Sequence, residues 1–321
     1  MLSSRAMDLL RAIPDLQISQ NVPLSQLTRF ELGGPAALLA DACTEEALIR
    51  TIQAIRESGD PWTLIGGGSN LVVHDDGFPG VVVRYVGSGI RIDGQEVHVE
   101  AGARLQDLVD LTIGRGLKGL DTMTGIPGWV GGAIYGNAGA YGHSIDERVE
   151  LVRLFTGTEV LEIDQPACEF RYRESIFKVR KNWVILSAVL TLGEDSPESL
   201  KVSAEKILKI RDEKYPPTLR CAGSIFKNLL FHHLPPFVQA QVPPHLIREG
   251  KVPSAYFLEQ AGSKGMKKHG IVVADYHANL IYNDGHGTSA DLRDLIHELK
   301  ARVQQRFGLV LEEEVQYVGG P

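Results

Sequence analysis

The chain has 321 residues, 43% hydrophobic and 23% charged, which is a globular composition with room for two or three domains. Its formal net charge of −7 disfavours a nucleic-acid binder, because such a protein carries a basic surface. Cys43, Cys168 and Cys221 include no CxxC pair, so we predict neither a disulfide framework nor a metal site, and a reducing cytoplasm fits. No apolar run is long enough to span a membrane, and the N-terminus is too polar for a signal peptide.

The first 85 residues predict a small α/β domain. A short helix over residues 5–13 should stop at Pro14. Thr44 is the expected N-cap of a second helix, which has acids in its first turn, an apolar stripe and a stop at Gly59. Strands are expected at Ala36 to Leu39, Trp62 to Ile65, Leu71 to Val73 and Val81 to Val83.

The next hundred residues are predicted to form mainly strands that are separated by glycine-containing turns. Alternating residues around Asp93-Gly94 predict a β-hairpin, since this dipeptide favours the tight hairpin turn. An amphipathic helix should follow over residues 103–115, and strands should lie near Val149 to Leu154 and Val184 to Leu192.

A third unit should start near Pro197 with a helix that ends at Pro216. Helical pieces are expected within residues 245–261, and short strands at Ile271 to Val273 and Leu280 to Tyr282. The last helix should be capped by Thr288 or Ser289 and end at Gly308, before a strand from Leu309 to Val318. We therefore predict an α+β fold of three domains: residues 1–84 plus 312–321, residues 85–196, and residues 197–311.

Two glycine-rich stretches are candidates for ligand binding. Seven glycines fall between Gly125 and Gly142, interleaved with apolar residues that are usually buried, which is typical of a backbone cradle or of a structural turn. The run Gly66 to Asn70 stands between strands and has no helix after it, so it is not a dinucleotide fingerprint. Its amides could form a phosphate nest or simply a tight turn.

Three later segments carry candidate chemical residues. In an extended chain, Arg171 and Arg173 would share one face, either for chemistry or as solvated side chains. Ser224 lies in CAGSIFKN, which could instead cap a helix. In LEEEVQYVG, alternation would place Glu312 and Glu314 on one face and Glu313 on the other, and a charged edge strand is the alternative reading.

The two glycine loops together resemble the FAD-binding half of vanillyl-alcohol-oxidase-type flavoproteins. The ordered motifs IPG-x-VGG, GN-x-GAYG, YR-x-S, R-x-x-K-x-P, AGS-x-FKN and LE-x-EV are most similar to the UDP-N-acetylenolpyruvoylglucosamine reductase family, over residues 24–319. This resemblance implies non-covalent FAD between two α+β subdomains, NADPH as co-substrate, a nucleotide-sugar substrate and a cytoplasmic role in peptidoglycan synthesis. It leaves the oligomeric state open, with a monomer compatible.

The resemblance also assigns residues. It implies that Arg173 stabilises the substrate carboxylate, that Ser224 donates a proton, and that Glu314 assists while protonated or sharing a proton, with the last strand bringing Glu314 beside Arg173. It implies FAD contacts from Gly66, Gly67, Gly68, Ser69, Asn70, Gly125, Ile126, Pro127, Gly131, Gly132, Gly136, Asn137, Gly139 and Ala140. It implies substrate contacts from Lys214, Asn228, Lys264 and Gly265.

Some features stay open or depart from the family. His277 and Asn279 match a family pattern, but a structural role for His277 is favoured. Glu313 and Leu229 replace prolines that are common in the family, and the short segment from Arg173 to Ser224 places the chain in the subgroup without an inserted tyrosine loop. The rival functions are an alcohol or sugar oxidase with flavin tethered at His143, and a non-catalytic flavin or nucleotide-sugar binder.

Overall fold

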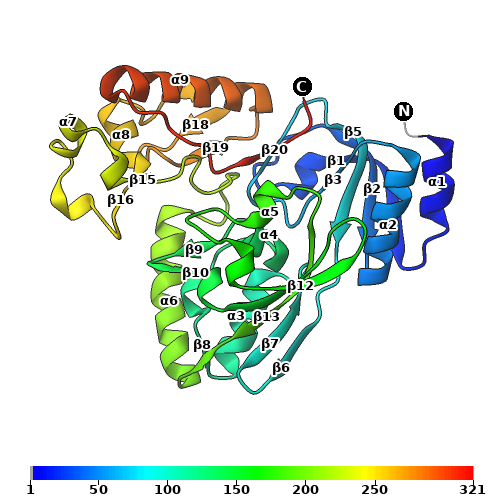
Figure 1. The fold of residues 1–321 in the computed structure, drawn as a ribbon. Helices are drawn as coiled ribbons and strands as arrows, with labels where there is room; N and C mark the ends of the chain where they lie inside the picture. The colour runs from blue at the N-terminus through cyan, green and yellow to red at the C-terminus, as the bar shows by residue number, and fades with distance from the viewer. Residues whose placement is uncertain (1–2, 321) are drawn as a thin grey trace. The chain divides into compact units, whose positions relative to one another are not determined.

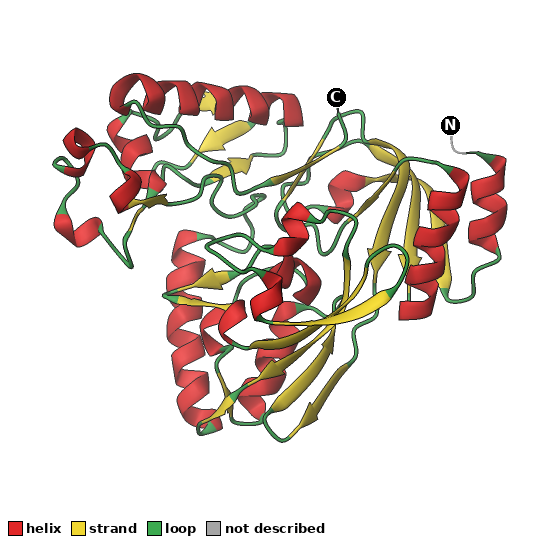
Figure 2. Cartoon of the chain, viewed as in Figure 1, coloured by secondary structure: helices red, strands yellow, loops and turns green. Residues whose placement is uncertain are grey.

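The structure is a computed structural model that describes residues 3–320, and these residues form two compact units (Figure 1). Unit 1 contains residues 3–22, 36–68 and 78–213, and unit 2 contains residues 23–35, 69–77 and 214–320. Both units mix helices with strands (Figure 2), so the α+β class expected from the sequence is confirmed.

The first sheet of unit 1 has the strand order β1 (Leu16–Pro23), β2 (Pro35–Ala42), β5 (Phe78–Tyr85) and β3 (Trp62–Leu64). Strands β2 and β3 run parallel to β5, whose valines are buried as expected for a central parallel strand. Helices α1 (Ser4–Arg11) and α2 (Glu45–Ser58) pack against each other. The predicted ends of α2 are confirmed, because Thr44 accepts a hydrogen bond from the Ala47 amide and Gly59 is left-handed.

The second sheet of unit 1 is antiparallel, in the order β12 (Val160–Asp164), β11 (Val149–Phe155), β13 (Val184–Thr191), β7 (Glu96–Glu100) and β6 (Ile90–Asp93). The hairpin predicted at Asp93-Gly94 joins β6 to β7, with Gly94 at a φ of 60°. The predicted amphipathic helix is α3 (Leu105–Gly114).

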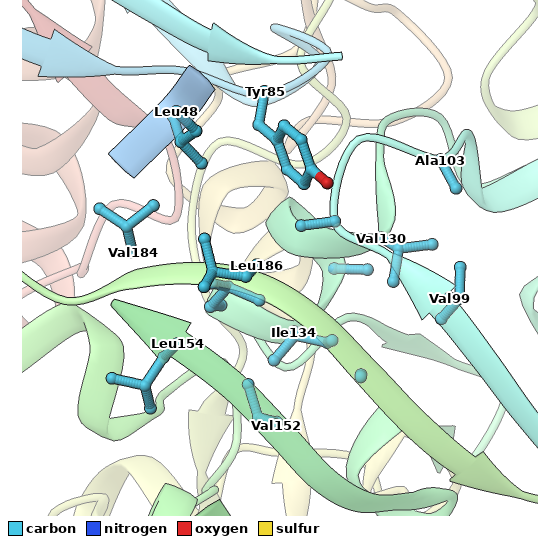
Figure 3. Packing of buried hydrophobic residues seen from close by; sticks show 14 of the residues in the cluster. Leu48, Tyr85, Val99, Ala103, Val130, Ile134, Val152, Leu154, Val184 and Leu186 are labelled. Carbon is cyan, nitrogen blue, oxygen red and sulfur yellow. The ribbon is translucent and has the colours of Figure 1, made fainter. Parts of the chain in front are cut away.

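One continuous apolar core joins the two sheets of unit 1. In Figure 3, Val130 and Ile134 of the short helix α4 (Val130–Tyr135) lie beside Val99 of β7 and Leu186 of β13, with Leu48 and Tyr85 contributed by the first sheet and its helix. The glycine-rich stretch is therefore anchored through its few apolar side chains. Pro127 is an exception to the burial expected of them, because it is exposed.

Helix α6 (Pro197–Lys214) departs from the expected domain boundary at residue 197, because it belongs to unit 1 through Glu213. Its Ser203 hydroxyl donates to the buried Asp121 carboxylate at 2.9 Å, and its Arg211 donates to the Gly125 carbonyl at 3.3 Å. Helical periodicity predicts which residues form a helix but not which domain its apolar face covers.

Unit 2 is built on the small antiparallel sheet β17 (Lys267–Lys268), β18 (Ile271–Val273) and β19 (Ile281–Asn283). Helix α9 (Ser289–Phe307) packs on this sheet and on α8 (Ser254–Gln260). The caps predicted for α9 are confirmed, since Thr288 and Asp291 form a capping box and Gly308 is left-handed.

The last strand pairs with a strand from the first part of the chain. Strand β20 (Gln316–Val318) lies parallel to β4 (Leu71–Val73), and this pairing places β4 in unit 2 rather than in the first predicted domain. The strand expected from Leu309 is shorter than predicted, because Glu313 makes only an isolated β-bridge, to Phe226.

The remaining elements are short: β8 (Leu117–Lys118), β9 (Gly139–Ala140), β10 (His143–Ser144), α5 (Ile176–Val179), β14 (Gly193–Glu194), β15 (Leu229–Leu230), α7 (Pro236–Gln239) and β16 (Lys251–Val252). No helix within residues 3–320 combines the length and low polarity that crossing a lipid bilayer requires.

Candidate active site

The Gly66 to Gly68 part of the first glycine loop contacts the second glycine stretch inside unit 1. A Cβ atom added at Gly67 would lie 2.9 Å from Trp129 Cδ1 and 3.2 Å from Gly128 Cα. Glycine at position 67 is therefore required by direct contact between the loops, which are 61 residues apart in the chain. From the sequence, the two loops are linked only by a family resemblance. The structure shows that they are in contact.

The glycines of the two loops fall into two groups. In the first group, a Cβ would meet protein atoms: at Gly131 it would lie 2.9 Å from Ala101 Cβ, and at Gly139 it would lie 2.4 Å from the His143 carbonyl oxygen. In the second group the neighbouring space is open: a Cβ on Gly132 would meet nothing within 4 Å, and at Gly66 the nearest atoms are 4.0 Å away. Protein packing does not require glycine at these two positions, but close approach of a ligand would require it. Open backbone of this kind fits a bound dinucleotide cofactor such as FAD.

Helix α4 forms within the second glycine stretch, where the sequence did not predict a helix. The amide of Gly131 donates to the Ala101 carbonyl at 2.8 Å, and that of Gly125 donates to Gln106 Oε1 at 2.7 Å. The amide of Gly136 donates to Gly132 within the helix at 3.0 Å. The amides of Gly125, Gly131 and Gly136 thus already have acceptors in the protein.

Arg173 lies in a tight turn rather than in the extended strand that was predicted. Arg171 and Glu174 exchange two backbone hydrogen bonds of 3.0 Å, and Arg173 has a φ of 59°. This geometry removes the alternation that would place Arg171 and Arg173 on one face. The Arg173 guanidinium instead donates to the carbonyl oxygens of Asn137 at 3.2 Å and Gly139 at 2.7 Å.

Asn137 has a structural task that its assignment as a cofactor contact did not anticipate. Its side chain is buried, donates to the Arg171 carbonyl at 3.0 Å and accepts from the Asp146 amide at 3.3 Å. It therefore ties the end of the glycine stretch to the arginine turn. Gly139 and Ala140 form β9, which is paired with β10.

The proposed proton donor, Ser224, lies in unit 2 on an extended segment, and the helix cap that was its alternative reading does not form. Ser224 forms an isolated β-bridge with Leu280 on one side of this segment. Phe226, two residues later, forms an isolated β-bridge with Glu313 on the other side. The Glu314 amide donates to the Ile225 carbonyl at 2.7 Å. The segments that carry Ser224 and Glu314 are therefore adjacent in unit 2, whereas Arg173 belongs to unit 1.

Asn279 holds the Ser224 segment in place. Its buried side chain accepts from the Phe226 amide at 2.9 Å and donates to the Phe226 carbonyl at 2.8 Å and to Ser254 Oγ at 2.7 Å. The role that the sequence left open for Asn279 is structural. His277 accepts a hydrogen bond from the Asn279 amide at 3.2 Å, and burial, followed by the charge of Lys214, lowers the pKa of His277 to about 4. Its neutral imidazole agrees with the structural role that the sequence favoured.

Glu314 is positioned through its backbone by Asn70. The Asn70 amide side chain donates to the Glu314 carbonyl at 2.9 Å, and the Asn70 carbonyl accepts from the Gln316 amide at 2.9 Å. A residue predicted to contact FAD thus anchors the segment before β20 that carries the predicted catalytic acid. The neighbouring acids point to different partners, as alternation predicts: Glu312 pairs with Lys227, and Glu313 pairs with Lys300 at 2.8 Å.

The predicted substrate residues also lie in unit 2. The Lys214 ammonium lies 5.0 Å from the centre of the Tyr215 ring, and Asn228 Oδ1 accepts from the Ser254 amide at 3.4 Å. Lys264 is exposed and pairs with Glu259 at 3.2 Å, and Gly265 is left-handed with a φ of 72°. Their roles toward a substrate stay predictions.

Sequence reasoning missed Tyr215, whose hydroxyl lies 2.8 Å from Ser224 Oγ. The signal was its place inside the R-x-x-K-x-P motif, where it occupies the variable position between Lys214 and Pro216.

Comparison with known proteins agrees with this arrangement. Residues 36–162 match the FAD binding domain family, and residues 215–318 match the family described as UDP-N-acetylenolpyruvoylglucosamine reductase, C-terminal domain. The reductase of Solibacter usitatus is 56% identical over 97% of this chain and 99% of its own length. The reductase of Rubrobacter xylanophilus is 34% identical over 93% of this chain and 94% of its own length.

A solved structure shows the same architecture. The crystal structure of UDP-N-acetylenolpyruvylglucosamine reductase from Thermus caldophilus matches with a TM-score of 0.75 and 27% identity, covering 94% of this chain and 99% of that one. The chain belongs to the UDP-N-acetylenolpyruvoylglucosamine reductase family.

Proposed function

We propose that this protein reduces UDP-N-acetylglucosamine enolpyruvate to UDP-N-acetylmuramate, a step in peptidoglycan precursor synthesis, with non-covalent FAD as cofactor and NADPH as electron donor. The observation that carries the proposal is the similarity to curated reductases over almost the whole chain. The open backbone beside Gly66 and Gly132 agrees with a cofactor that lies against the two glycine loops.

When bound and reduced by NADPH, FAD would supply a hydride for the terminal vinyl carbon of the substrate. The residues that would hold it are those of the two loops, Gly66 to Asn70 and Gly125 to Ala140. As the reaction proceeds, negative charge develops on the adjacent substrate carbon and on its carboxylate. Arg173 stabilises this charge with its planar, positively charged guanidinium, which the Asn137 and Gly139 carbonyls help to orient.

Ser224 donates the proton that completes the reduction. Its O–H bond breaks as a C–H bond forms at the carbanionic carbon, and the β-bridge to Leu280 fixes the backbone from which the hydroxyl extends. Glu314 assists this step from a segment adjacent to that of Ser224, since its amide donates to the Ile225 carbonyl. The Asn70 side chain sets the position of the Glu314 backbone.

Lys214, Asn228, Lys264 and Gly265 are proposed to bind the nucleotide-sugar part of the substrate, with Lys214 and Asn228 at its diphosphate. A cytoplasmic location is part of this proposal. Within the described residues, Cys43, Cys168 and Cys221 form no disulfide, which fits a reducing compartment.

Steady-state oxidation of NADPH by purified, flavin-loaded protein tests the proposal. NADPH loss should require UDP-N-acetylglucosamine enolpyruvate and should stop when either component is omitted. Acid precipitation should release the flavin into solution, because the cofactor is not covalently attached. A flavin-loaded preparation with no substrate-dependent loss of NADPH would overturn the assignment.

A further inference from the structure

Tyr215 and Ser224 form a hydroxyl pair in unit 2, with 2.8 Å between their oxygens. This separation is that of a well-formed O–H···O hydrogen bond. Either oxygen can be the donor in this geometry, so the proton can be shared in both directions.

Each member of the pair is held by its surroundings. The Tyr215 ring packs against the small apolar cluster of Cys221, Ala274 and Leu280. The Lys214 ammonium lies 5.0 Å from the ring centre on one side, and the His277 ring centre lies 6.0 Å away. The backbone of Ser224 is fixed by its bridge to Leu280, a residue of the same cluster. The contact between the two hydroxyls is therefore built into the fold.

We propose that Tyr215 is a positioning residue for Ser224 that also restores its proton, an inference that rests on the proposed function. When Ser224 directs its own hydrogen at the substrate carbon, its oxygen accepts a hydrogen bond from the Tyr215 hydroxyl. This arrangement selects one rotamer of the serine, the one from which its proton can leave toward the substrate.

The proton transfers balance. The Ser224 O–H bond breaks as the substrate C–H bond forms, which leaves an alkoxide on Ser224. The Tyr215 O–H bond then breaks as the Ser224 O–H bond re-forms, and the phenolate takes a proton from solvent water. The transfer from tyrosine to serine is downhill, because a phenol is a stronger acid than an aliphatic alcohol.

The test uses Tyr215→Phe, which removes one oxygen and keeps the ring that packs in the cluster. Flavin reduction by NADPH should be unchanged, and flavin reoxidation by UDP-N-acetylglucosamine enolpyruvate should slow on the order of tenfold to a hundredfold. The KM for the substrate should change much less than kcat, because the missing hydroxyl acts on proton transfer rather than on binding. Tyr282→Phe is the matched control, since Tyr282 packs on the same cluster and should keep the wild-type rate.

A double-mutant cycle shows whether Tyr215 acts through Ser224. In a Ser224→Ala background, Tyr215→Phe should cause less than a further twofold loss, measured in single turnovers with a flavin-loaded enzyme. The inference is overturned if Tyr215→Phe reoxidises within twofold of wild type, or if it causes the same fractional loss in both backgrounds. A wild-type enzyme that did not reduce the substrate at all would remove the proposed function itself, and with it this role for Tyr215.

Discussion

The guanidinium of Arg173 donates a hydrogen bond of 2.7 Å to the carbonyl oxygen of Gly139. A second guanidinium nitrogen donates to the Asn137 carbonyl at 3.2 Å, and the Asn137 side chain donates in return to the Arg171 carbonyl at 3.0 Å. The arginine turn and the end of the glycine stretch therefore fix each other. Within unit 1, the loop proposed to hold FAD also orients the arginine proposed to bind the substrate carboxylate.

Replacing Arg173 by lysine should distinguish the contribution of its positive charge from that of its planar hydrogen-bonding geometry. Lysine keeps the positive charge, but its single ammonium cannot reach two carbonyls and a carboxylate as a planar fork can. We expect kcat to fall on the order of a hundredfold to a thousandfold, while flavin reduction by NADPH persists. Arg171→Lys, two residues away and exposed, is the control and should keep near-normal turnover. An Arg173→Lys enzyme with half the wild-type kcat would contradict this role.

Two neighbouring glycines of α4 should respond differently to alanine. At Gly131 a Cβ would press on Ala101 at 2.9 Å, so Gly131→Ala should lower the melting temperature of the flavin-free protein. At Gly132 the space is open, so Gly132→Ala should leave that temperature unchanged or raise it, because alanine favours a helix by about 1 kcal/mol over glycine.

The same Gly132→Ala variant should bind FAD more weakly, since the added methyl group occupies space that the cofactor is proposed to use. Titration of flavin-free protein with FAD measures this directly. Unchanged FAD affinity in Gly132→Ala would place the cofactor elsewhere.

Removing the Asn279 side chain should destabilise the protein. The buried amide makes three hydrogen bonds, to the amide and carbonyl of Phe226 and to Ser254. Asn279→Ala leaves these groups buried without their partner, and we expect a loss of about 2–4 kcal/mol in the free energy of unfolding, measured by urea denaturation. Asn182→Ala removes an exposed amide with one hydrogen bond and should cost about 0.5 kcal/mol or less. Equal losses of unfolding free energy in the two variants would mean that the Asn279 side chain does not hold the Ser224 segment in place.

His277 should make stability depend on pH. Burial, and then the charge of Lys214, lowers its pKa in the folded protein from an ordinary value of 6.5 to about 4. Between these values the unfolded chain binds a proton that the folded protein does not, so stability is full above pH 6.5 and falls as the pH drops toward 4. The pKa difference corresponds to a limit of about 3 kcal/mol.

Urea denaturation at pH 7 and pH 4.5 tests this dependence. His277→Gln should lose less stability between the two pH values than wild type does. His297→Gln, at an exposed position, should keep the wild-type difference. If His277→Gln and wild type lose the same stability, burial of His277 does not govern the response.

Elements with their own start and stop residues could be predicted from sequence. Helices α2 and α9 carry Thr44 and Thr288 as N-caps and glycines 59 and 308 as stops, and the structure places their ends there. Such signals act locally through backbone hydrogen bonds, so no knowledge of tertiary packing is needed.

Elements that depend on tertiary contacts could not be predicted in this way. Strands β1 and β12 are largely exposed and show weak alternation, so their pairing partners define them. Helix α4 forms despite two glycines, because Val130 and Ile134 are buried in the core of unit 1. The position of α6 in unit 1 follows from its contacts with Asp121 and Gly125, which helical periodicity does not encode.

The candidate site shows the same difference between features that local sequence predicts and features that depend on tertiary contacts. The motifs named Arg173, Ser224 and Glu314 for chemistry. They also contained Asn70, Asn137 and Asn279, but they did not reveal that these asparagines have structural roles. The asparagine side chains form hydrogen bonds with backbone groups of segments far apart in the chain, and Tyr215, which the motifs did not single out, contacts Ser224 through its hydroxyl. Contacts of this kind follow from the fold, and a linear motif does not reveal them.

The most direct test of the account follows the flavin through two half-reactions without oxygen. NADPH should bleach the flavin absorbance of the wild-type enzyme, and UDP-N-acetylglucosamine enolpyruvate should restore it, with one UDP-N-acetylmuramate formed per flavin by mass spectrometry. Ser224→Ala should be bleached at the wild-type rate and recover its absorbance slowly. Reduced wild-type flavin that stayed bleached in the presence of the substrate would contradict the account.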